Sequence, residues 1–153
     1  MGVITDYFSA PSDEAAATVL RDEDAGPPPP SFDTLTTNGI DPCVMLGQLE
    51  ALLTGTSYEQ VIANPRHCKD VQGEAELEKE DPALVIAVTD SLQRALVSAD
   101  DATLESAALA WSQIEEFSGQ GDAKGLASWL RELAALARRA SEKSERLYCL
   151  WCA

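Results

Sequence analysis

Four cysteines and a single histidine are the residues of this sequence best suited to metal or redox chemistry. Cys149 and Cys152 have the CxxC spacing of zinc and thiol–disulfide sites, and Cys43, His67 and Cys68 could complete a set of ligands. The stretch that carries the CxxC pair, RLYCLWCA, is bulky and apolar, which predicts a buried strand rather than a metal-binding turn. In a strand, Cys149 and Cys152 point to opposite faces, so they cannot bind one metal ion.

Other catalytic patterns have weaker support. His67 lies in a highly charged stretch, which predicts a solvated side chain, and a sequence neighbour such as Cys68 usually points elsewhere. Paired carboxylates such as Asp100 and Asp101 are expected by chance among 26 acidic residues. The sequence has neither a phosphate-binding glycine loop nor a G-x-S-x-G nucleophile motif. We therefore expect no catalytic residue, no metal and no cofactor, and we expect the four cysteines to be thiols.

The chain is strongly acidic, with 26 acidic against 11 basic residues and a net charge of −15. The charge is uneven, because residues 1–80 have a net charge of −11 and residues 81–153 a net charge of −4. Binding to phosphates requires clustered Lys and Arg, and only Arg138 and Arg139 are adjacent. Direct binding to nucleic acid or to anionic membranes is therefore not expected. A basic protein partner is favoured, because long-range attraction would speed its association, although the acidity could serve solubility alone.

The polar segment 66–82 is predicted to be an exposed acidic loop, and its EAELEKED stretch is the densest cluster of carboxylates. This loop could be a solvated connector or a docking surface for a basic partner. Charge accelerates association more than it strengthens a complex, so hydrophobic anchors are also needed, and Tyr58 and Leu77 are the nearest candidates. The predicted partner-binding residues are Tyr58, Glu74, Glu76, Leu77, Glu78, Glu80 and Asp81.

The helices and strands predicted along the chain indicate an α+β fold. We expect a helix-rich single domain over residues 1–153 with a small sheet of about three short strands. The stretches that favour strands are residues 2–8, 83–88 and 146–152, and the last two bracket three helices and could pair, with the first as a neighbour. The stretches that favour helices are residues 10–24, 39–55, 56–65, 89–100, 100–117 and 122–145. Consecutive prolines predict a stiff surface spacer at residues 22–31.

The helix within residues 39–55 is the most clearly marked element. Asp41 is predicted to cap its start, with Pro42 in the first helical position and Gly55 closing its end. Its apolar stripe, which we expect to face the core, consists of Val44, Leu46, Leu49, Leu52 and Leu53. The predicted N-caps of three other helices are Ser12, Ser57, and Thr89 or Asp90.

Three stretches resemble the YfbM-like family of small bacterial proteins, which carry a domain of unknown function. They are the start MGVITDYF, the segment LEALLTGTS, and the long helix that leads into an apolar terminal strand. The resemblance covers most of the chain in order, and it implies an α+β fold of about this size. The helix before LTGTS often contains aromatic and histidine residues in the family, whereas this chain has Pro42, Cys43, Leu46 and Gly47 there.

These observations favour a protein that works by binding rather than by catalysis. No apolar run approaches 18 residues, and the N-terminal stretch is acidic rather than basic, so we expect a cytoplasmic protein without a membrane span. The favoured function is a non-enzymatic interaction module, most concretely an immunity-type inhibitor that neutralises a basic protein. One alternative is an acidic decoy that mimics nucleic acid. Another is a small-molecule binder or enzyme with a cleft near His67, Cys68 and the C-terminal strand.

Overall fold

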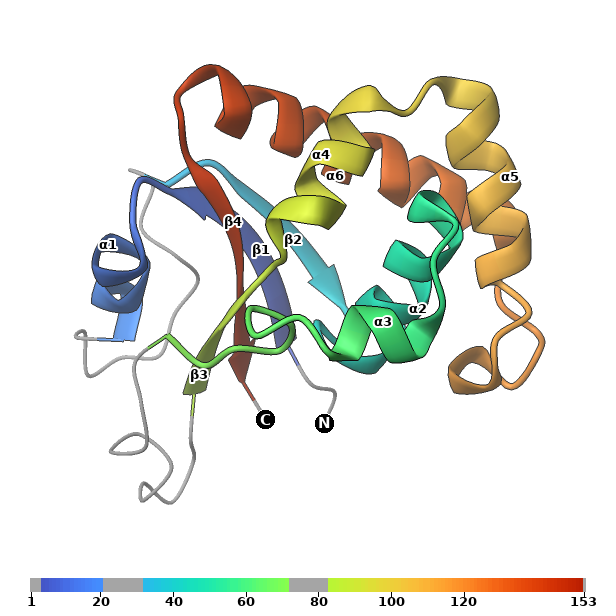
Figure 1. The fold of residues 1–153 in the computed structure, drawn as a ribbon, viewed down its shortest axis with the longest axis horizontal. Helices are drawn as coiled ribbons and strands as arrows, with labels where there is room; N and C mark the ends of the chain where they lie inside the picture. Colours follow the sequence, from blue (N-terminus) through green and yellow to red (C-terminus); the bar gives the residue numbers. More distant parts are fainter. Residues whose placement is uncertain (1–3, 21–31, 72–82, 153) are drawn as a thin grey trace.

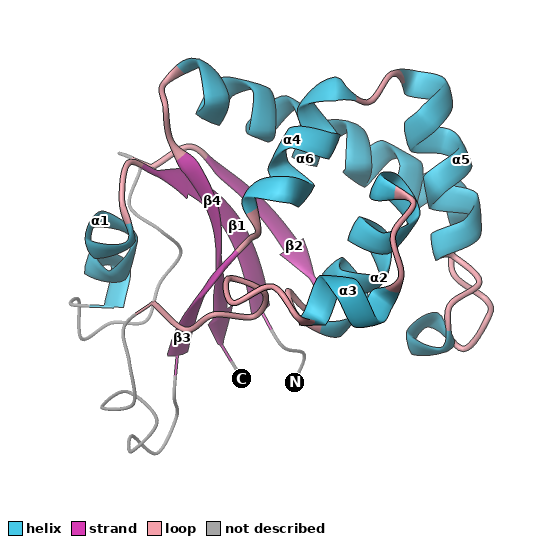
Figure 2. Cartoon of the chain, viewed as in Figure 1, coloured by secondary structure: helices cyan, strands magenta, loops and turns pink. Residues whose placement is uncertain are grey.

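Four antiparallel strands form one sheet in the order β2-β1-β4-β3 (Figure 1). The structure is a computed structural model, in which residues 4–20, 32–71 and 83–152 are described. Helices pack on both faces of the sheet, which confirms the predicted α+β fold, with four strands rather than about three (Figure 2). The Pro-rich spacer predicted at residues 22–31 lies outside the described residues.

The strands lie where the sequence predicts them, with one addition. β1 (Ile4–Ala10) and β4 (Arg146–Cys152) form the central pair, and β3 (Ala83–Ala87) pairs with the other side of β4. The expected pairing of these three strands is therefore confirmed. β2 (Thr34–Asn38) was not predicted, because its threonine-rich sequence has neither an apolar run nor a clear alternation. β2 forms because its backbone pairs with β1, and this pairing compensates for the weak strand preference of its own sequence.

The helices match most of the predicted segments. The serine or threonine hydroxyls of Ser12, Ser57 and Thr89 accept backbone N–H groups as N-caps, as predicted. The first helix is shorter than predicted, because a 3-10 turn begins at Thr18, where β-branched residues replace a run of alanines. The helical elements are α1 (Asp13–Ala17), η1 (Thr18–Leu20), α2 (Val44–Thr54), α3 (Tyr58–Ile62), α4 (Asp90–Ser98), α5 (Asp101–Trp111), η3 (Glu115–Phe117) and α6 (Ala123–Glu142).

The sheet separates a large core from a small one. The long helix α6 lies on one face of the sheet with α2, α4 and α5, and α1 lies on the other face (Figure 1). Side chains alternate between the two faces along each strand, so Tyr7 and Cys149 enter the large helical core, whereas Phe8 and Tyr148 enter the small core beneath α1. None of the helices in the described ranges is both long enough and apolar enough to cross a membrane.

Aromatic side chains connect the sheet to the helices in the large core. Trp129 of α6 contacts the ring of Tyr7 at 5.4 Å and that of Trp111 at 5.9 Å between centroids. The Tyr7 hydroxyl donates to the carbonyl oxygen of Ile40 at 2.6 Å, and Trp111 Nε1 donates to that of Met45 at 2.9 Å. Both buried polar groups therefore bind the backbone around the start of α2, which fixes that helix to β1 and α5.

The predicted apolar stripe of α2 faces the core only in part. Leu46 and Leu49 are buried and Leu53 is partly buried, but Val44 and Leu52 are exposed. The prediction is wrong for Val44 and Leu52, which lie two turns apart on one side of the helix. α4 and α5 contact α2, but they cover Leu46 and Leu49 and leave Val44 and Leu52 open to solvent.

An ion-pair network joins α1 to β4 and to the segment after α3. The Arg66 guanidinium donates to both oxygens of Asp13, at 3.0 and 3.3 Å, and lies over the Tyr148 ring. The Tyr148 hydroxyl donates to Asp13 at 2.6 Å, and the Lys69 ammonium lies 3.6 Å from the same carboxylate. Hydrogen bonds from Arg66 and Tyr148 lower the pKa of Asp13 to about 2 despite its partial burial.

We expect the substitution Asp13→Asn to reduce the free energy of unfolding by about 1–2 kcal/mol at neutral pH, because charge-assisted hydrogen bonds are lost. Since folding depresses the pKa of Asp13 to about 2, its stabilisation is present above the ordinary value of 3.8 and is lost as pH falls toward 2. Urea unfolding of both proteins between pH 7 and about pH 2.5 measures this loss. Glu14→Gln, at an exposed position, is the control, and a difference between Asp13→Asn and wild type that did not shrink at acidic pH would contradict the prediction.

Candidate functional site

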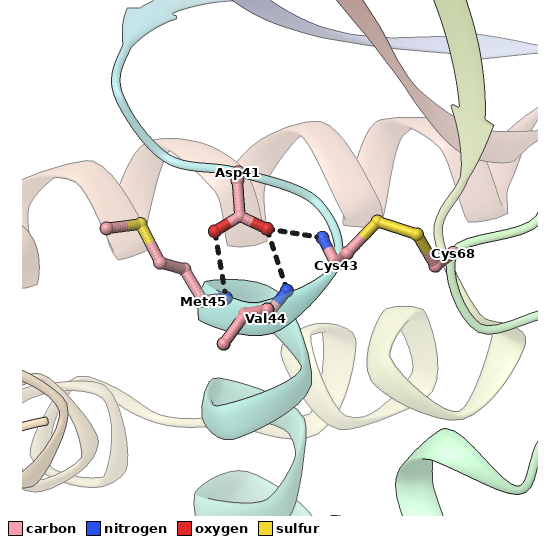
Figure 3. Close-up of a disulfide and its surroundings, with 5 residues drawn as sticks. All are labelled: Asp41, Cys43, Val44, Met45 and Cys68. Carbon is pink, nitrogen blue, oxygen red and sulfur yellow. Dashed lines mark hydrogen bonds between the residues drawn. A yellow bond between two sulfur atoms is a disulfide. The ribbon is translucent and has the colours of Figure 1, made fainter. Parts of the chain in front are cut away.

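Cys43 and Cys68 form a disulfide, although the sequence predicts four thiols (Figure 3). Cys43 lies at the start of α2, and Cys68 lies in the turn between α3 and β3. The two Cα atoms are 4.9 Å apart, within the usual range for a disulfide, across a sequence separation of 25 residues. The prediction was wrong because only the folded chain brings these two positions together. Disulfides persist mainly in oxidising compartments, so this bond weighs against the predicted cytoplasmic location.

The carboxylate of Asp41 fixes the backbone next to the disulfide. It accepts the N–H groups of Cys43 at 2.8 Å, Val44 at 2.7 Å and Met45 at 3.2 Å (Figure 3). The Asp41 side chain therefore caps the helix, as predicted, but the regular helix begins at Val44, two residues after the predicted first position at Pro42, and its N-cap position is Cys43. Gly55 ends the helix in the left-handed conformation with φ of 70°, as predicted.

His67 is partly buried against α2 rather than solvated as predicted. A Cβ atom on Gly47 would lie 2.9 Å from His67 Cε1 and 2.8 Å from Tyr58 Cε2, so both rings pack directly on the helix backbone. Burial lowers the pKa of His67, while the negative charges of Glu50 and Asp41 act in the opposite direction. The neutral imidazole is therefore the main form at neutral pH.

Glu50 is a buried carboxylate that connects α2 to α4. The hydroxyls of Thr89 and Ser91 both donate to it, the second at 3.1 Å. Thr89 also accepts the N–H of Leu92 at 3.2 Å, so one hydroxyl both caps α4 and satisfies Glu50. Because a buried carboxylate is stable only when its oxygens are hydrogen-bonded, this group fixes the distance between the two helices.

A small cavity lies between the disulfide and Glu50. Its volume is about 10 Å³, and His67, Cys68, Gly47 and Thr89 are among the residues that line it. A cavity of this size holds about one water molecule, whereas small-molecule sites usually measure several hundred Å³. Cys68 is oxidised, so it offers His67 no thiol to activate. This geometry describes a structural support for α2 rather than a reaction site.

The terminal CxxC pair lies on β4, which is a continuous strand as predicted. Cys149 is buried in the large core among residues of β1 and α6. Its strand partners are Tyr7 and Ile86, whereas the backbone of Cys152 pairs with Ile4 and Ala83 at the end of β4. Among the residues that the structure describes, no group of three or more His, Cys, Asp or Glu could hold a metal ion.

Asp6 is a buried carboxylate in the centre of the sheet that the sequence did not single out. Its side chain lies on the face of β1 that carries Phe8, and its Oδ1 atom has no hydrogen-bond partner in the described part of the chain. Burial raises the pKa of Asp6, and a hydrogen bond with Thr36 acts in the opposite direction. No sequence signal marks this residue, because a lone Asp within a strand looks the same whether it faces solvent or the core.

Of the predicted partner-binding residues, Tyr58 lies in the described part of the chain and the others do not. Tyr58 lies on α3 and is partly buried against Gly47, so its ring has a packing role. The other predicted partner-binding residues lie outside the described residues. They are the carboxylates Glu74, Glu76, Glu78, Glu80 and Asp81, together with Leu77.

A groove of about 410 Å³ lies between α2 and α5. Leu52, which is 42% exposed, and Leu53 form the α2 side of this groove, and Asp100 lies at the start of α5. The remaining lining residues are small, and they are Ala102, Thr103, Ser106, Ala107 and Ala110. Leu109, which is 61% exposed, is one helical turn from Ser106. The sequence assigned Leu52 to the core, because a helical pattern does not reveal which sides of a helix are covered.

A second hollow, of about 490 Å³, lies between α5 and α6. Its lining includes Lys124, Ala127 and the ion-paired side chains of Glu105 and Arg131, whose closest atoms are 2.6 Å apart. Arg131 also lies 3.7 Å from Asp101. Glu105 and Arg131 therefore neutralise each other in this hollow, whereas Asp100, beside the groove between α2 and α5, makes no ion pair in the described part of the chain.

We expect replacement of both Cys43 and Cys68 by serine to lower the free energy of unfolding by about 3 kcal/mol, because the unfolded chain regains the freedom of a closed loop. Denaturant unfolding under oxidising conditions measures this difference. A reductant should lower the stability of the wild-type protein to that of the double variant and leave the variant unchanged. Equal stability of the two proteins without reductant would contradict a stabilising disulfide.

We expect Gly47→Ala to destabilise the fold by about 1–2 kcal/mol, because overpacking against the two rings exceeds the better helix propensity of alanine. A double-mutant cycle with Tyr58→Ala separates these effects. In the Tyr58→Ala background, the penalty of Gly47→Ala should shrink, since one of the two clashes is absent. An unchanged or larger penalty in that background would show that contact with Tyr58 is not the cause.

Comparisons of this chain with protein-family models, curated proteins and solved structures find no match. Similarity to the YfbM-like family therefore stays a prediction from the sequence motifs.

Proposed function

We propose that this protein is a non-enzymatic interaction module that binds a basic protein, most concretely as an immunity-type inhibitor. The proposal is supported by a contrast between the basic and the acidic side chains. Most basic side chains of the described residues are bound within the protein, whereas many carboxylates are exposed without an ion-pair partner.

The basic residues bind carboxylates of other elements. Arg139 binds both oxygens of Asp33, at 2.5 and 3.1 Å, and Arg146 lies 3.3 Å from Asp90. Arg66, Lys69 and Arg131 also make ion pairs. Arg138 instead donates to the backbone carbonyl oxygens of residues 97 and 99. These cations are therefore largely neutralised before any partner arrives.

Several exposed carboxylates remain outside these ion pairs in the described part of the chain. They lie on the helical side of the molecule, at α3, at both ends of α5 and before α6. These residues are Glu59, Asp100, Glu115, Glu116 and Asp122. Exposed charges of one sign attract a protein of opposite charge over about 10 Å at moderate salt, which raises its association rate. The predicted acidic segment 66–82 would add to this field.

We expect the tagged protein to retain a basic protein from lysate of its own source at about 50 mM salt and to lose most of it at about 500 mM salt. The matched control neutralises four free carboxylates by Glu59→Gln, Glu115→Gln, Glu116→Gln and Asp122→Asn. This control should retain less of the same protein, because only the surface charge has changed. The purified partner should then bind the wild-type protein with a Kd that rises with salt. Recovery of the same proteins by both baits, without enrichment of basic ones, would contradict the proposal.

A further inference from the structure

The groove between α2 and α5 is a candidate docking surface in the described part of the chain. Leu52 is exposed at its edge, although burial of a leucine side chain is worth about 2 kcal/mol or more. A volume of about 410 Å³ is enough for a few side chains of a partner, unlike the cavity of about 10 Å³ beside His67.

The floor of the groove suits a helix. α2 and α5 run next to each other and form the two sides of the groove, and small side chains such as Ala102, Ser106 and Ala110 allow close approach between them. An amphipathic helix places apolar residues into a groove of this kind at every third or fourth position. The 11 residues of α5 extend over about 16 Å, which corresponds to three turns of a bound helix.

The charge around the groove is negative, and no basic side chain lines it. Asp100 lies at one end, and its hydrogen bond to Thr103 lowers its pKa, so it is ionised at neutral pH. Glu115 and Glu116 follow the other end of α5. Among the described residues that line the groove, Asp100 is the one charged side chain and Leu52 and Leu53 are the large apolar ones. This combination is complementary to a helix that carries leucine-like side chains on one face and a Lys or Arg beside them.

We infer that the groove between α2 and α5 binds a basic amphipathic helix of the partner protein, an inference that rests on the proposed function. Apolar side chains of that helix enter between Leu52 and Ser106, and a cationic side chain pairs with Asp100. The groove supplies the affinity, because buried apolar contacts determine dissociation, while the wider acidic surface supplies the association rate.

The test uses the full-length protein and a labelled synthetic peptide of about 18 residues, made of leucine and lysine, with leucines at helical spacing. A peptide of the same composition in scrambled order controls for charge. Fluorescence anisotropy at about 50 mM salt gives the Kd of each peptide. We expect the amphipathic peptide to bind about tenfold more tightly than the scrambled one, because only the first presents a continuous apolar face.

Variants of the protein locate the binding surface. Leu52→Gln removes the apolar edge and Ser106→Tyr fills the groove, and each should weaken binding of the amphipathic peptide about fivefold. Asp100→Asn should weaken binding and reduce its salt dependence, while asparagine preserves the helix cap. Ile62→Gln is the control, since Ile62 is exposed on α3 and does not line the groove.

The outcomes separate this inference from the proposed function. Equal binding of both peptides, with no effect of Leu52→Gln or Ser106→Tyr, would show that only diffuse charge attracts them, and would overturn the groove while leaving a basic partner in place. Weakening by Ile62→Gln as large as that by Leu52→Gln would also overturn it. Absence of binding by either peptide would reject the groove as a site for basic helices, and the capture experiment would then decide separately whether a basic partner exists.

Discussion

The first turn of α2 is held by contacts from several parts of the chain, and the helical layer depends on its position. Asp41 caps its N–H groups, and the Cys43–Cys68 disulfide ties it to the segment before β3. Tyr7 and Trp111 donate hydrogen bonds to backbone carbonyl groups on either side of the turn. These contacts come from β1, from α5 and from the segment after α3, so the start of α2 cannot move without disturbing three other elements.

Because these contacts fix α2, the helix stays in position although some of its apolar side chains are exposed. The packing of α2 on α4 is completed by Glu50, whose charge is satisfied by two hydroxyl groups of the α4 N-terminus. The outer side of α2, with Val44 and Leu52, then needs no contribution from burial to keep the helix ordered. A partner that covers Leu52 gains most of the free energy of burial, because the surface it meets is already rigid.

Local signals in the sequence were sufficient to predict most elements, and long-range contacts explain what they missed. The caps at Ser57 and Thr89 and the apolar run of β3 depend on neighbouring residues, so they could be recognised. β2 becomes a strand only by pairing with β1, and the disulfide depends on residues that are 25 positions apart. His67 was expected to be solvated, because nothing in its local sequence shows that its ring packs on the backbone of Gly47, which lies on another element. The exposure of Leu52 could not be predicted either, because it depends on how other helices pack against α2.

Charge and apolar contact have different parts in the binding that we propose. A net charge of −15 acts over many residues, but exposed charges add little free energy to a complex once salt screens them. A groove lined by Leu52 and small residues acts only at contact, where it excludes water. Because most basic side chains of the described residues are already bound within the protein, an acidic partner would gain little from either contribution, whereas a basic partner with an apolar helix face would gain from both. Specificity therefore requires the two features on the same face of the partner, which separates it from proteins that are merely basic.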